Sequence, residues 1–159
     1  MTAFVGASLG ATYTAAELTG QESGGVPGIG DIYVSHDNKR YRFVQYNPGV
    51  GNIAAVTGRA AYFFAPGGVS AGLTNTVTSD LSDSSEVGAG ILMGDIPNGG
   101  YGWIQIGGVA TMSVALTAGV DGDPLTATGA TDGTLDVGEQ AGIHVALALE
   151  LAAAGDQPA

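Results

Sequence analysis

Glycine and proline interrupt this chain every few residues, with 28 glycines and 6 prolines among 159 positions. Each glycine in the interior of a helix costs roughly 0.5–1 kcal/mol relative to alanine, so long helices are not expected. The short apolar runs between these turn signals are typical of β-strands. The sequence therefore predicts a mainly β protein with little helix, built as a small antiparallel β-barrel or sandwich.

The beginning of the chain differs from the rest. Residues 1–30 include the Gly/Ser-rich piece 21–28, which is typical of an extended arm or loop. Residues 14–18 (Thr-Ala-Ala-Glu-Leu) are expected to form one helical turn within it. We therefore expect an extended N-terminal arm ahead of the folded domain.

Residues 31–151 are expected to form a single β-rich domain, which can be divided further into sub-lobes at 31–78 and 87–151. The last residues, 152–159 (Ala-Ala-Ala-Gly-Asp-Gln-Pro-Ala), resemble a flexible tail because they carry little that could anchor them.

Several hairpins are expected from the spacing of β-rich runs. Two such runs, 31–35 and 40–46, flank a short polar loop with Asp37-Asn38, and residues 53–57 and 60–64 flank Gly58-Arg59. The strongest local signal is Gly107-Gly108, a two-residue connection between the runs 101–106 and 109–114. Further expectations are a polar acidic loop at 79–86, a strand at 87–93, short strands and turns at 121–137, and a strand at 143–151, whose apolar residues alternate.

Charge is distributed very unevenly along the chain. Residues 1–78 hold four acids and all four bases, whereas residues 79–159 hold eleven acids and no base, so the net charge of −11 lies in the second half. Nucleic-acid binding needs several Lys or Arg residues to displace phosphate counterions, and it is therefore excluded. The asymmetry predicts an acidic face toward solvent and a neutral face toward a partner.

The absence of some residue types excludes further classes. There is no cysteine, so disulfides, thiolate metal sites and cysteine nucleophiles are ruled out. Residues 1–5 lack the basic and long apolar regions of a signal peptide, and no apolar run is long enough for a membrane-spanning helix. Synthesis in the cytoplasm, without a membrane partner, is expected.

No motif in the sequence predicts catalysis or a cofactor. Ser35, His36 and Asp37 are adjacent on the chain and cannot face one another as a triad; His36 and His144 have no further ligands at zinc spacing; and no lysine follows the glycine-rich runs, as a phosphate-binding loop requires. We therefore expect no enzyme activity, no cofactor and no metal site. The acidic residues that invite a calcium test lack the spacing of a calcium loop, and Asp-Gly and Asp-Pro turns explain them equally well: Asp121, Asp123, Asp132, Asp136 and Glu139.

The basic residues are the most distinctive side chains. Lys39, Arg40 and Arg42 lie within four positions of a chain with only four bases. On a strand Arg40 and Arg42 share one face, which Val44 and Tyr46 continue. A solvated strand face is the simpler interpretation, and contact with an acidic partner is the alternative. The candidate contact residues are Lys39, Arg40, Arg42, Arg59, Tyr101 and Trp103, of which Trp103 also fits a core position.

Five runs resemble a family of phage proteins. The runs 30–47, 54–58, 78–82, 87–90 and 100–108 (the last reading Gly-Tyr-Gly-Trp-Ile-Gln-Ile-Gly-Gly) are similar to capsid decoration proteins, also called cement or head-stabilising proteins, of tailed bacteriophages. The resemblance spans most of residues 30–150 and carries no catalytic signature.

The resemblance implies a structural virion protein on the outer surface of the head. Such a protein bridges neighbouring subunits of the major capsid protein, and self-association is implied as well, with a homotrimer favoured over a dimer. The alternative from a different class is a carbohydrate-binding or adhesin-like β-sandwich on a virion or cell surface.

Overall fold

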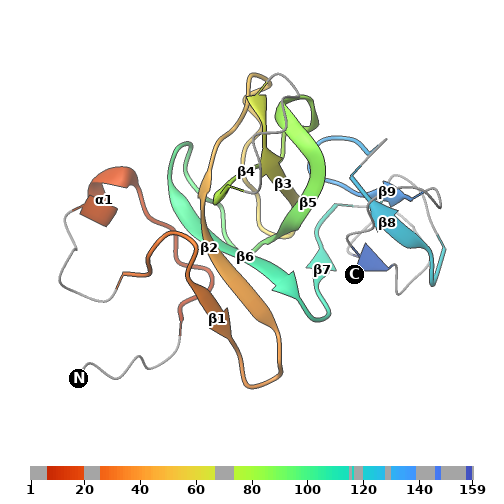
Figure 1. The fold of residues 1–159 in the computed structure, drawn as a ribbon, viewed down its shortest axis with the longest axis horizontal. Coiled ribbons are helices and arrows are strands. Elements are labelled where there is room, and N and C mark those ends of the chain that lie inside the picture. The colour runs from red at the N-terminus through yellow and green to blue at the C-terminus, as the bar shows by residue number, and fades with distance from the viewer. Residues whose placement is uncertain are drawn as a thin grey trace.

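The structure is a computed structural model that describes residues 7–19, 26–66, 74–114, 116, 120–127, 130–138, 146–147 and 157–158. Figure 1 shows one short helix and a set of strands, most of them gathered in the middle of the molecule. The elements are α1 (Ala15–Thr19), β1 (Ile32–Val34), β2 (Arg40–Tyr46), β3 (Ala60–Phe64), β4 (Thr76–Thr78), a 3-10 turn (Leu81–Asp83), β5 (Ser84–Leu92), β6 (Tyr101–Gly107), β7 (Thr111–Met112), β8 (Pro124–Thr126), β9 (Asp136–Val137), β10 (Ala146–Leu147) and β11 (Gln157–Pro158).

Five strands close into a barrel in the order β2-β4-β3-β5-β6, because β6 pairs with both β5 and β2. The β2–β4 pair is parallel and the other four pairs are antiparallel. This confirms the expectation of a mainly β barrel with little helix. Closure removes the free sheet edges that an open sheet would expose.

Strand β2 takes part both in the barrel and in a hairpin that lies outside it. One of its edges pairs with β6 from Arg40 to Gln45. The other edge pairs with β1 over Arg40–Arg42 and with β4 at Gln45 and Tyr46. The predicted β1–β2 hairpin is therefore confirmed, and it extends away from the closed ring (Figure 1).

The alternation of side chains along the barrel strands produces three apolar clusters. The barrel interior is filled by one set, which includes Val44, Tyr46, Phe63, Val77, Leu92 and Ile104. Outward-facing Ala60, Tyr62 and Ile91 pack against the segment after β6, including Met112, Leu116, Leu125 and Leu135. Outward-facing Tyr41, Phe43 and Trp103 pack against residues before β1, including Leu9, Tyr13 and Leu18.

The described part of the predicted arm is attached to the barrel. Tyr13 exchanges two backbone hydrogen bonds with Tyr101, with N–O distances of 2.8 and 2.7 Å. The predicted helical turn forms as α1, where Glu17 accepts hydrogen bonds from the backbone and side chain of Thr14. Residues 7–19 therefore cover one outer face of the barrel.

Two predicted hairpins are wrong. Residues 53–57 form no strand, and β3 pairs instead with β4 and β5. The hairpin across Gly107-Gly108 does not form because β2 and β5 already occupy both edges of β6. The side chain of Gln105 then folds over this turn and donates to the carbonyl of Val109 at 2.9 Å.

The acidic loop and the chain end also differ from expectation. Residues 84–86 of the expected loop belong to β5, while the strand predicted at 87–93 is confirmed as the rest of it. The short strands expected at 121–137 are present as β8 and β9. Within the run 143–151 the structure describes only β10, and within the predicted tail it describes β11, which pairs with β7 rather than lying free.

Candidate interaction surface

The three clustered bases lie where β1 turns into β2. The loop between these strands closes with a hydrogen bond from the Ser35 N–H to the Lys39 carbonyl at 2.9 Å, and Asn38 adopts a positive φ of 62° there. Asparagine tolerates this conformation better than most residues, which suits the Asp-Asn sequence of the turn. The hairpin therefore places Lys39 and Arg40 at its tip and Arg42 one step further along β2.

Arg40 and Arg42 point to the same side of the hairpin as two exposed aliphatic residues. Arg40 pairs with Val34 and Arg42 with Ile32, and directly paired residues of antiparallel strands share a face. Ile32 and Val34 are 56% and 55% exposed. We call these four residues, Ile32, Val34, Arg40 and Arg42, the hairpin face.

The hairpin face carries positive charge without a carboxylate partner. Within the residues that the structure describes, the ion pair is that of Lys39 with Asp37, at 3.7 Å, and neither Arg40 nor Arg42 forms one. The pKa of Asp37 is lowered, first by the hydrogen bond from the Ser35 hydroxyl and to a smaller extent by the charge of Lys39. Two guanidinium groups therefore remain open to a partner.

Arg59 lies apart from this surface. Its backbone bonds with Val56 and Leu92 at the start of β3, and its side chain passes close to Gly133. The guanidinium Nη1 donates to the carbonyl of Ala54 at 3.4 Å, and its buried Nε has no hydrogen-bond partner among the described residues. The structure thus brings together Lys39, Arg40 and Arg42 and leaves Arg59 elsewhere.

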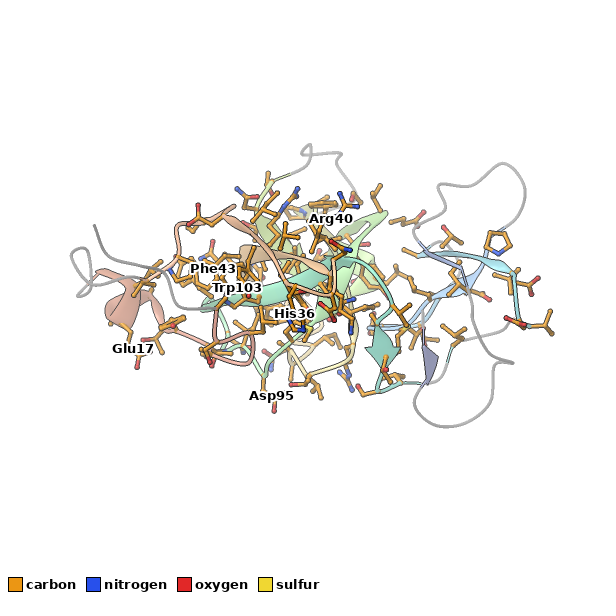
Figure 2. The ribbon with its side chains drawn as sticks, turned by 90° about the horizontal axis from the view of Figure 1, so that it is seen from below. Glu17, His36, Arg40, Phe43, Asp95 and Trp103 are labelled. Atoms are coloured by element: carbon orange, nitrogen blue, oxygen red, sulfur yellow. The ribbon has the colours of Figure 1, made fainter. Side chains whose placement is uncertain are left out.

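The two aromatic candidates belong to the packed face of β2 and β6. Trp103 is 3% exposed and meets Phe43 edge-to-face, with ring centroids 5.3 Å apart. Figure 2 shows the two rings together, with Arg40 set apart from them. Trp103 therefore occupies the core position that its sequence context also fits, in a cluster against which Leu9, Tyr13 and Leu18 pack. Tyr101 is half-buried beside it and stacks on Phe43 at 6.4 Å.

The expected division into an acidic and a neutral face does not follow the two halves of the chain. Strands β5 and β6, from the acidic half, close the barrel together with β2, β3 and β4 from the neutral half. Moreover, two of the eleven acids, Asp80 and Asp83, are buried at 2% and 7% exposure. Three of the four basic residues nevertheless lie together at one hairpin.

The buried pair Asp80 and Asp83 was not identified by sequence reasoning. Asp80 accepts hydrogen bonds from the Gly51 N–H at 2.7 Å and from the Ser82 hydroxyl at 2.6 Å, and Asp83 accepts one from the Val50 N–H at 2.5 Å. Burial alone raises the pKa of Asp80, but these hydrogen bonds outweigh burial and leave the pKa lowered. The two carboxylates hold the turn at residues 49–51 in place, which is a structural role.

The remaining acids do not gather into a site. Asp132 accepts from the Leu81 N–H at 2.8 Å, Asp123 from the Val120 N–H at 2.9 Å, and Asp136 from its neighbour Val137 at 2.7 Å. Across the described ranges no three His, Cys, Asp or Glu side chains are close enough to hold a metal ion. His36 is exposed in the hairpin loop, while His144 and Glu139 lie outside the described residues.

The described helix is also too short to cross a membrane, and no other described segment forms a long apolar helix. Among the described residues, the hairpin face is therefore the surface that combines arginines without a carboxylate partner with exposed aliphatic side chains. Comparison of the chain with protein-family models, with curated proteins and with solved structures finds no match.

Proposed function

We propose that this chain is a non-enzymatic structural protein of a tailed-phage virion, which binds the outer surface of the head and stabilises contacts between major capsid subunits. The resemblance of most of residues 30–150 to capsid decoration proteins is one support. The observation that carries the proposal furthest is the hairpin face, where Arg40 and Arg42 stand beside exposed Ile32 and Val34 with no carboxylate partner among the described residues.

A surface of this kind suits a lattice of identical sites. Exposed aliphatic side chains contribute apolar burial, and arginines on the same face pair with carboxylates and set the orientation of docking. Many copies on one shell gain from avidity when they are joined into homo-oligomers, so each single contact can be weak. The remaining negative charge of the molecule keeps the free protein soluble before it binds.

The carbohydrate-binding alternative requires exposed aromatic rings against which a sugar can stack. Phe43, Trp103 and Tyr41 are all buried at 5% exposure or less beneath the N-terminal segment. These aromatic rings therefore form a surface on which residues 7–19 pack, and they are not exposed for a sugar to stack on. Binding of the isolated protein to a glycan array would favour this alternative over decoration.

The proposal is tested by co-sedimentation with phage heads that lack the protein. We expect binding to emptied, expanded heads and not to prohead precursors, at a copy number comparable with that of the shell protein. A copy number of only a few per particle would contradict decoration.

The role of the hairpin face is tested with charge variants of matched net charge. Arg40→Gln/Arg42→Gln changes the net charge from −11 to −13, and the control Thr74→Asp/Asn98→Asp changes it equally at exposed positions outside the hairpin. We expect the arginine variant to lose head binding at least ten-fold more than the control. Equal binding of the two variants would remove the hairpin face from the contact.

A further inference from the structure

Strand β1 offers an open edge in addition to the hairpin face. In the sheet order β1 stands at the end, paired with β2 on one side, and no described element bonds to its other side. Phe43 N–H donates to the Asp31 carbonyl, and Ser35 N–H donates to the Lys39 carbonyl. The odd-numbered residues from 31 to 35 therefore direct their backbone N–H and C=O groups toward β2. Because hydrogen-bonded pairs alternate in an antiparallel ladder, the backbone N–H and C=O groups of Ile32 and Val34 point away from β2.

We propose that this edge pairs with the same edge of a second copy of the chain, which forms a dimer with two-fold symmetry. The two outward-facing residues fit each other in an antiparallel register, with Ile32 of one copy opposite Val34 of the second. Four backbone hydrogen bonds then form, two from each copy, and Tyr33 faces its symmetry mate across the axis. An isologous contact of this type needs only one self-complementary patch, and it closes at two copies.

Side chains on both faces of the joined sheet suit this register. Ile32 and Val34, more than half exposed in the single chain, pack against each other across the junction on the hairpin face. On the opposite face the two Tyr33 rings form a close, non-hydrogen-bonded pair, the arrangement that aromatic cross-strand pairs favour. The contact therefore buries apolar surface that the monomer leaves in water.

Charge is complementary in the same register. Asp31 of one copy comes opposite Ser35 of the second copy, whose N–H donates to the Lys39 carbonyl, so Lys39 stands between its ion-pair partner Asp37 and the Asp31 of the other copy. The like-charged Arg42 and Arg40 of the two copies are separated by three strand spacings, about 14 Å. That distance exceeds the screening length of about 8 Å at physiological ionic strength, so their repulsion is weak.

This dimer would double the surface assigned to capsid binding, because the two hairpin faces become one continuous sheet surface with four arginines. It differs from the trimer that the family resemblance favours. The inference concerns the isolated protein, so its failure in solution would leave the head-binding experiment unaffected, and failure of head binding would leave the dimer unaffected.

A proline substitution at the edge separates pairing from folding. Val34→Pro removes an N–H that points away from β2, so the hairpin itself loses no hydrogen bond, and edge strands tolerate proline at such positions. Two of the four hydrogen bonds between the copies disappear, and we expect dimerisation to weaken about thirty-fold. Val34→Thr keeps the N–H and the branched shape, and it should dimerise nearly as the unmodified protein does.

Sedimentation velocity gives the oligomeric state, and amide hydrogen exchange at Ile32 and Val34 shows whether the edge is paired. We expect a dimer with protected edge amides, and a Val34→Pro variant that dissociates at about thirty-fold higher concentration while its circular dichroism matches the unmodified protein. A protein that stays monomeric, or a dimer whose edge amides exchange freely, overturns the inference.

A single cysteine tests the two-fold axis directly and does not depend on the proline variant. The chain contains no cysteine, so Tyr33→Cys introduces one thiol per copy. Facing Cα atoms at a non-hydrogen-bonded pair lie about 4.5 Å apart, within disulfide range. Mild oxidation should yield a covalent dimer for Tyr33→Cys and far less for the control Val50→Cys, which is 90% exposed; equal yields would overturn the proposed register.

Discussion

The hydroxyl of Tyr62, in β3, donates a hydrogen bond to the main-chain carbonyl of Thr134, a residue 72 positions further along the chain. The same hydroxyl lies 3.1 Å from the carbonyl of Thr131. One buried side chain thus fastens the segment between β8 and β9 to the outside of the barrel, and burial raises the pKa of this phenol well above its usual range.

Removal of that hydroxyl should weaken the attachment. Tyr62→Phe leaves the buried carbonyl of Thr134 without this donor, so we expect a loss of about 1–3 kcal/mol in the free energy of unfolding. Urea denaturation followed by circular dichroism measures it. The control Tyr13→Phe, whose hydroxyl makes no hydrogen bond within the described residues, should change stability by less than about 0.5 kcal/mol; equal losses in both variants would contradict the attachment.

Asp80 should make stability depend on pH in the acid range. Its pKa is lowered in the folded protein, so the ionised carboxylate stabilises the fold above its unfolded pKa of about 3.9 and this stability is lost as pH falls through the folded pKa. At pH 7 we expect Asp80→Asn to be less stable than the unmodified protein, and the difference to shrink below about pH 4. Thermal unfolding at pH 7 and pH 3 measures both, and the exposed Asp121→Asn should show no such difference at either pH.

Gly90 should resist substitution because of a close backbone approach. It adopts a φ of 153°, and a Cβ built on it would lie 2.4 Å from the carbonyl oxygen of Gln105 in β6. Gly99 also has a positive φ, 73°, but nothing lies within 4 Å of its Cβ position. We expect Gly99→Ala to cost about 1 kcal/mol from backbone strain alone, and Gly90→Ala clearly more because β5 and β6 must separate. Guanidinium denaturation gives the free energy of unfolding of the two variants. Similar losses would show that β5 and β6 can separate at Gly90 at little cost.

The fluorescence of Trp103 should report whether the N-terminal segment is bound. Trp103 is the one tryptophan of the sequence and belongs to the buried cluster against which Leu9, Tyr13 and Leu18 pack. Deletion of residues 1–19 exposes the ring to water, so we expect a red-shifted emission and greater quenching by acrylamide, while the circular dichroism of the barrel persists. Deletion of residues 1–6 alone is the control and should leave the emission unchanged. An unshifted spectrum after the longer deletion would show that other residues shield Trp103.

The β1–β2 hairpin and the two faces of β2 could be predicted because their signals are local. The Asp37-Asn38 turn fixes the pairing, and the period of two along residues 40–46 separates Val44 and Tyr46 from Tyr41 and Phe43. The same alternation placed Arg40 and Arg42 together. The exposure of Ile32 and Val34 was not foreseen, because β-branched residues in a strand usually face a core.

The wrong predictions concern partners that are distant in sequence. Gly107-Gly108 satisfies every local requirement of a hairpin, yet β6 is already paired on both edges by strands that begin at residues 40 and 84. Asp80 and Asp83 lie in a stretch of Ser and Asp residues that resembles solvent-exposed loop. Their burial depends on the turn at residues 49–51, about thirty positions earlier in the chain. No pattern within either segment predicts this contact.

The pairing of β6 between β2 and β5 also sets the time at which the barrel can form. Strand β2 is complete at residue 46, but its barrel partner β6 ends at residue 107, so its edge stays open while some sixty further residues are synthesised. Pairings between strands that are far apart in sequence form slowly, because a long loop must close before the stabilising contacts can form. During translation, the first half can pair β1 with β2 and β3 with β4, but the edge of β2 that faces β6 stays exposed until the second half is made, which favours aggregation.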